Sequence, residues 1–365
     1  MTESIRRQLV VPPYASAIQV AAGLGLLAAG VGLLASSARQ PVAELAPAVE
    51  LAEVASPVPA PAPRAAVAAS EQAAPLVDEI KLMFRAGGAS YMRLADVERD
   101  DAGALGWPRH GRPRLVTEDG AQIALAEVHH EDLPAVHRAW AGRQVVVEGG
   151  CRATVVGFAV ASRLYGDPGY AGLEKEHWDV AGVMQAGAQV LAARLDGCSG
   201  TYARDAALAP VAIPEPIRDE GLAAAARRAL LASPAAAEVA QGFEELRSTG
   251  IEGAWWQHAE LSADVLRHPR TGATFVAVHA SAEYYCGGPD INVWGLYRVG
   301  AGGALAPVHV VRLEQLRSIE KIIDVEGDGE LELIGRTWPS DDVVLAGADG
   351  RALDTLGMHF YGCPC

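Results

Sequence analysis

The chain has 365 residues, of which 50% are hydrophobic, and a formal net charge of −15 at pH 7. This apolar content is too high for an intrinsically disordered chain, so the sequence predicts packed hydrophobic cores. The acidic balance excludes nucleic acid as a partner, because binding to a phosphate backbone requires a basic surface.

An apolar segment at Ala15–Ala38 carries no charge and follows Arg6 and Arg7. It is long enough to span a membrane, and the preceding arginines favour a cytoplasmic N-terminus, residues 1–14. The length of the apolar core favours an uncleaved signal anchor over a signal peptide cleaved after Ala38. We therefore predict a transmembrane signal anchor at residues 15–38 that contacts the membrane. The main body is then extracytoplasmic, in the periplasm or at the cell surface.

All five cysteines lie on the predicted exported side, where an oxidising environment favours disulfides. We predict a Cys151–Cys198 bridge and a second bridge that joins Cys286 to Cys363 or Cys365. A metal held by Cys363 and Cys365 is a weaker alternative, because two ligands do not complete a site.

Residues 39–75 are rich in Ala, Pro, Val and Glu, which is typical of a semi-rigid spacer. Residues 76–213 then predict a β-rich extracytoplasmic domain that begins with a short helix at Leu76–Ala86. Asp119-Gly120 between two apolar runs predicts a β-hairpin, with one strand at Arg114–Glu118. Further strands are expected at Gln144–Glu148, Ala153–Ala161 and Val190–Leu195, and a turn of helix is expected at Glu131–Ala139.

Residues 214–365 predict a helical pair followed by a second β-rich domain. Asp219 and Pro234 bound the first helix, Arg218–Ser233, and a second follows at Ala235–Arg247. From Asp264 onward, short apolar runs separated by turn residues favour an antiparallel sandwich or an incomplete propeller-like sheet. The expected fold class is α+β, mainly antiparallel β with a helical insert, preceded by one N-terminal transmembrane helix and a Pro/Ala-rich linker.

One run, Ile322–Arg336, carries residue types suited to a metal ion. Asp324, Glu326, Asp328 and Glu332 occupy positions 1, 3, 5 and 9 of a loop, so that several carboxylate oxygens can converge on a hard cation such as Ca²⁺. The run is no EF-hand, because it lacks the final glutamate and the second helix. An acidic turn that only caps a hairpin is the alternative to a calcium site.

The same run resembles the calcium-binding loop of FG-GAP and VCBS-type β repeats, and Asp341–Leu356 takes the place of the next hairpin. The resemblance covers residues 322–356. It implies a calcium-binding loop between two strands, in a protein for adhesion or ligand presentation rather than catalysis. Glu326 stands where the family has Asp or Asn, and this chain has one copy of the loop where the family has several.

Other candidate sites rest on single clusters. A helix from Glu131 would place His130 and His137 on one face, close to His129, although their spacing matches no zinc signature. The rings of Trp255-Trp256 suit sugar stacking, but in a helix-to-sheet connection such residues are more often part of a core or a domain interface. Cys286, in YYCGGPD, suits a disulfide better than a nucleophile in this compartment.

These observations predict a membrane-anchored binding or structural module of the cell envelope, stabilised by calcium, with an envelope protein or a glycan as partner. The alternative is an envelope metal-dependent hydrolase that uses the His129–His137 region.

Overall fold

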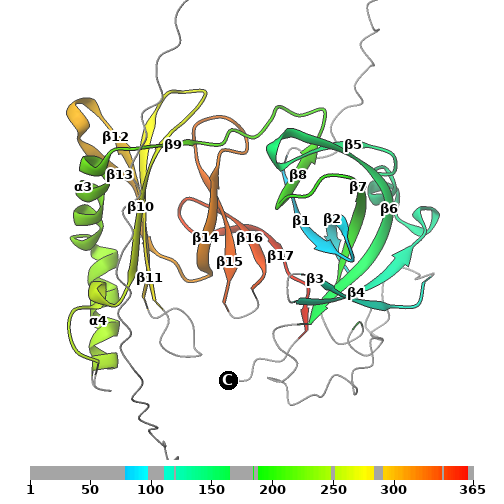
Figure 1. Cartoon of the computed structure of the whole chain (residues 1–365), viewed down its shortest axis with the longest axis horizontal. Coiled ribbons are helices and arrows are strands. Elements are labelled where there is room, and N and C mark those ends of the chain that lie inside the picture. The colour runs from blue at the N-terminus through cyan, green and yellow to red at the C-terminus, as the bar shows by residue number, and fades with distance from the viewer. Residues whose placement is uncertain are drawn as a thin grey trace, which may run out of the picture. The chain divides into compact units, whose positions relative to one another are not determined.

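The computed structural model describes residues 79–97, 111–118, 121–164, 184, 188–247, 251–282, 291–338 and 341–360, all of which belong to the unit Val67–Cys365. Strands make up 52% and helices 19% of the structure, so antiparallel β-sheet dominates it. The strands form three sheets (Figure 1).

The expected fold class, α+β with a transmembrane helix, is wrong. The described residues are mostly antiparallel β and contain three helices, α1 (Ala135–Arg138), α3 (Glu220–Leu231) and α4 (Pro234–Arg247). In this part of the chain, no helix has both the length and the apolar character needed to cross a membrane. The predicted anchor and linker, residues 15–75, lie outside the described residues.

One helix expected in the first sheet is absent, whereas the strand expected at Val190–Leu195 is observed despite its alanines. A helix was predicted over Leu76–Ala86, but Lys81–Ala86 is strand β1. Ala192 and Ala193, which favour a helix by propensity, are buried in strand β7 (Val190–Asp196). There they pair with strands on both sides, and this tertiary pairing overrides helix propensity.

The first sheet closes on itself because the long strand β6 (Cys151–Leu164) pairs with both ends of the series. The ring runs β6-β5-β8-β1-β2-β7 and returns to β6, so these strands have few unpaired edges. The second half of β6 also pairs with β4. The other strands of this sheet are β2 (Ala89–Asp96), β3 (Arg114–Glu118), β4 (Ala121–Val128), β5 (Gln144–Val147), β8 (Tyr202–Asp205) and β18 (His359–Phe360).

The predicted hairpin and the predicted disulfide of this sheet are both confirmed. Strands β3 and β4 form the expected hairpin, with Val116 opposite Ile123, although its turn residues lie outside the described part. Cys151 at the start of β6 and Cys198 after β7 form a disulfide with a Cα–Cα distance of 5.9 Å. The predicted partners of Cys286 lie, like Cys286 itself, outside the described residues.

The second sheet is an antiparallel meander covered on one face by α3 and α4 (Figure 1). Asp219 caps α3 by accepting a hydrogen bond from the backbone N–H of Leu222. Because side chains alternate along a strand, Val276 and Val278 pack under the helices while Ala277 and His279 face the other way. The strands are β9 (Glu215–Ile217), β10 (Glu260–Arg267), β11 (Thr274–Ala282), β12 (Ile291–Val299) and β13 (Leu305–Arg312).

The third sheet contributes to two separate hydrophobic cores. Ile323 and Leu345 join a core with the first sheet, whereas Leu333 and Val344 join Trp294 in a core with the second. Its strands run in order as β14 (Leu316–Ile323), β15 (Glu332–Thr337), β16 (Val343–Gly347) and β17 (Ala352–Leu356). Residues of all three sheets therefore come close to β14.

The segment that connects the first sheet to the second forms backbone hydrogen bonds with the residue that follows β14. Ala212 forms a two-bond antiparallel bridge with Asp324, with N···O distances of 3.0 and 2.8 Å. The predicted domain boundary between residues 213 and 214 stays a prediction.

Candidate functional site

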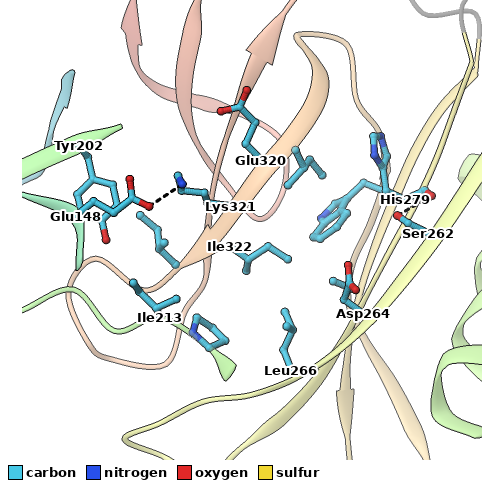
Figure 2. A pocket seen from close by; sticks show the side chains of 15 residues that line it. Glu148, Tyr202, Ile213, Ser262, Asp264, Leu266, His279, Glu320, Lys321 and Ile322 are labelled. Carbon is cyan, nitrogen blue, oxygen red and sulfur yellow. Dashed lines mark hydrogen bonds and ion pairs between the residues drawn. The ribbon is translucent and has the colours of Figure 1, made fainter. Parts of the chain in front are cut away.

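A cavity of about 350 Å³ opens where strand β14 faces the second sheet and the end of β5 (Figure 2). Polar and apolar side chains from all three sheets line it. Three of them, Ser262, Asp264 and Leu266, alternate along β10, and Ala277 and His279 lie on the next strand. The cavity lies at the lower end of the volume range of small-molecule sites.

His279 is held in one orientation by Asn292, which is completely buried. The Nδ2 amide of Asn292 donates hydrogen bonds to the carbonyls of Leu313 and Leu316, which leaves its Oδ1 to accept one from His279 Nε2 at 2.8 Å. The proton of a neutral His279 therefore sits on Nε2, and Nδ1 carries a lone pair. Burial lowers the pKa of His279, chiefly by penalising the imidazolium, so the ring is neutral at pH 7.

Asp264 provides a carboxylate on the same side of the cavity (Figure 2). Ser262 lies opposite His279 across the β10–β11 pairing, and Asp264 lies opposite Ala277. Asp264 and His279 are thus diagonal neighbours on one face, with Cβ atoms about 7 Å apart. No described residue forms an ion pair or hydrogen bond with the Asp264 carboxylate. An unpaired carboxylate and an imidazole acceptor therefore face the same space.

The opposite wall carries a neutralised charge pair (Figure 2). Lys321 Nζ lies 2.6 Å from one oxygen of Glu148, whose other oxygen accepts a hydrogen bond of 2.9 Å from the Thr201 backbone. Burial acts to raise the pKa of Glu148, but the contacts with Lys321 and Thr201 outweigh it and lower that pKa. Burial, and secondly the negative charge of Glu148, raises the pKa of Tyr202 to about 12. Lys321 is therefore already ion-paired with the Glu148 carboxylate.

Apolar side chains complete the cavity. Ile213, Leu266 and Ile322 line it; Leu266 lies below Asp264, and Ile213 lies on the far side, near Glu148 (Figure 2). Trp294 also lines it, and its indole Nε1–H donates a 3.0 Å hydrogen bond to the carbonyl of Ala348. This bond connects Trp294 of the second sheet to the segment that follows β16 of the third.

The predicted calcium ligands lie elsewhere, in the loop between β14 and β15. Asp324 is completely buried, and its two carboxylate oxygens accept hydrogen bonds from the backbone N–H groups of Gly327 and Gly329 and from His268 Nε2. The His268 Nδ1 accepts from the backbone N–H groups of Arg270 and Thr271, so its proton is on Nε2. Internal hydrogen bonds thus use both oxygens of Asp324.

The other three acidic residues of this loop divide into two kinds. Glu326 and Asp328 are exposed, whereas Glu332 is 9% exposed and accepts a 2.8 Å hydrogen bond from the Val325 backbone. Burial raises the pKa of Glu332 to about 7, and the charges of Glu326, Asp324 and Asp328 add to this effect. Calcium binding by these four residues stays a prediction.

The histidine cluster is arranged differently from the expectation. The turn of helix predicted within Glu131–Ala139 is observed as α1, but this helix does not begin at Glu131, because Pro134 separates it from a 3₁₀ turn at His130–Asp132. His129 and His130 both contact Glu131, at 3.3 and 3.0 Å, while His137 lies on α1. In the described ranges, no group of three or more His, Cys, Asp and Glu side chains is placed to hold a metal ion.

Trp255 and Trp256 form an edge-to-face pair rather than a flat platform. Trp255 is 3% exposed within the core beneath α3 and α4, and Trp256 is 49% exposed. Neither lines the cavity. The core reading of Trp255 is therefore confirmed.

Sequence reasoning did not identify the cavity residues. Two signals were present. Asn292 lies in a run of mostly apolar residues, Ile291–Leu296, and a buried amide of this kind needs hydrogen-bond partners. The spacing of Ser262, Asp264 and Leu266 also marks one strand face. Neither pattern shows that strand β14 of the third sheet lies opposite this face of the second sheet.

No protein-family model, curated protein or solved structure matches this chain. The function of the cavity is therefore inferred from the residues that line it.

Proposed function

We propose that this chain is an extracytoplasmic binding module whose small ligand occupies the cavity beside Asp264 and His279. The observation that carries this proposal is the buried Asn292, whose amide hydrogen bonds hold His279 in one orientation. Burial of an amide costs free energy unless every polar atom is paired. A side chain held in this way beside an unpaired carboxylate is preorganised, which lowers the entropic cost of binding.

The disulfide supports the extracytoplasmic location. Cys151 and Cys198 are bonded, and structural disulfides persist in oxidising compartments. The test is to alkylate freshly isolated protein under denaturing, non-reducing conditions. We expect Cys151 and Cys198 to escape labelling. A C-terminal reporter that is active only in the cytosol would contradict the location.

Occlusion of the cavity tests the binding function. Ser262 is exposed and lines the cavity, so Ser262→Phe fills it without disturbing a core, and Ser262→Ala is the matched control. We expect a library of small fragments, screened by ligand-observed NMR, to yield compounds that bind the wild type and Ser262→Ala but not Ser262→Phe. If no fragment binds at millimolar concentration, or if Ser262→Phe binds the same set, the proposed function is wrong.

A metal-dependent hydrolase at His129–His137, and a glycan or envelope protein as partner, stay predictions from the sequence. The separation of His130 and His137 by Pro134 gives the hydrolase no structural support.

A further inference from the structure

The cavity places two hydrogen-bond acceptors on one side. His279 Nδ1 is an acceptor because Asn292 fixes the proton on Nε2, and no described residue donates to Nδ1. Asp264 is an acceptor because a carboxylate presents only oxygen lone pairs. A ligand that satisfies both groups must donate hydrogen bonds, and a positive charge on it would be stabilised by Asp264.

The charges around the cavity favour the same sign of ligand. Its lining contains three carboxylates, Glu148, Asp264 and Glu320, and a single fixed cation, Lys321. Glu148 neutralises Lys321, and Glu320 is held 2.8 Å from Arg336. The charge that remains for a ligand is that of Asp264, which attracts a cation and repels an anion.

The apolar walls distinguish an organic cation from a metal ion. Ile213, Leu266 and Ile322 cannot coordinate a metal, but they can bury a hydrocarbon chain. A hard metal ion also needs several oxygen ligands at close range, and Asp264 is the one unpaired carboxylate among the described cavity residues.

We infer that the cavity recognises a compact organic ammonium ion, with N–H groups directed at Asp264 and His279 Nδ1 and a short hydrocarbon chain against the isoleucines and Leu266. This inference rests on the proposed binding function and adds the chemical class of the ligand.

Three probes of equal size and different charge test the inference: n-butylammonium, 1-butanol and butyrate, measured by ligand-observed NMR at pH 7. We expect n-butylammonium to bind at least about tenfold more tightly than 1-butanol, as one charge-assisted hydrogen bond provides, and butyrate not to bind. Ser262→Phe should abolish binding of n-butylammonium.

A matched pair of charge variants tests whether the charge of Asp264 causes the preference for n-butylammonium. Asp264→Asn keeps the size of the side chain and removes its charge, and we expect it to weaken n-butylammonium binding at least about tenfold while 1-butanol is unaffected. Glu238→Gln removes an exposed charge from α4, on the covered face of the second sheet, and should change nothing. Both variants should keep the wild-type melting temperature, because both positions are exposed.

Failure of this inference differs from failure of the proposed function. If 1-butanol or butyrate binds as tightly as n-butylammonium and Ser262→Phe blocks it, or if Asp264→Asn has no effect, the ligand class is wrong and the binding site stands. If none of the three probes binds and no fragment does, both proposals are overturned.

Discussion

The buried Glu332 makes the stability of this protein depend on pH in a way that one substitution can isolate. Burial, with the nearby charges of Glu326, Asp324 and Asp328, raises the pKa of Glu332 from 4.5 to about 7. Because the folded state binds this proton more tightly than the unfolded state, ionisation destabilises the fold as pH rises from 4.5 through 7. Above pH 8, this difference in the pKa of Glu332 between the folded and unfolded states lowers the free energy of unfolding by about 3 kcal/mol.

Glu332→Gln should remove this dependence. The glutamine oxygen can still accept the hydrogen bond from the Val325 backbone, but the side chain carries no charge. In urea unfolding with the disulfide intact, we expect the stability of the variant relative to the wild type to grow by about 2–3 kcal/mol between pH 5 and pH 8.5. Glu330→Gln, an exposed neighbour, is the control. Parallel stability curves for the wild type and Glu332→Gln would refute this reasoning.

Three other predictions concern the disulfide, a glycine in strand β15 and the acidic loop. Replacing Cys151 and Cys198 with alanine should lower the free energy of unfolding by about 4 kcal/mol, given a sequence separation of 47 residues, and an unchanged urea midpoint would contradict this value. Gly335→Ala should destabilise the protein by about 3 kcal/mol or more, because a Cβ there collides with the Ser318 carbonyl. Gly157→Ala, which meets open space, should be close to neutral by thermal denaturation. The calcium prediction requires that millimolar Ca²⁺ raise the melting temperature and that Asp328→Asn abolish the rise; no rise would leave the loop as a hydrogen-bonded turn.

Local patterns predicted individual elements well. The Asp-Gly signal predicted the hairpin and its first strand, Arg114–Glu118, because turn chemistry and alternation act over a few residues. The helix predicted at Arg218–Ser233 is observed at Glu220–Leu231, with the predicted acidic start and a proline close behind its end. The disulfide followed from the compartment argument together with the number of cysteines.

Long-range pairing could not be predicted in the same way. The closed ring depends on β6 meeting both β5 and β7, and nothing in the local sequence of β6 specifies two partners. The calcium hypothesis treated Asp324 as a free ligand, but His268, 56 residues away, occupies one of its oxygens. The cavity was missed for the same reason, because Lys321 and His279 belong to different sheets and only the tertiary fold brings them to one space.

The most direct measurement of the central claim is a crystal structure of the wild-type protein soaked with n-butylamine at pH 7. We expect density for the ammonium group within hydrogen-bond distance of Asp264 and His279 Nδ1, with the chain against Leu266 and Ile322. A cavity that holds only water at saturating n-butylamine would contradict this expectation.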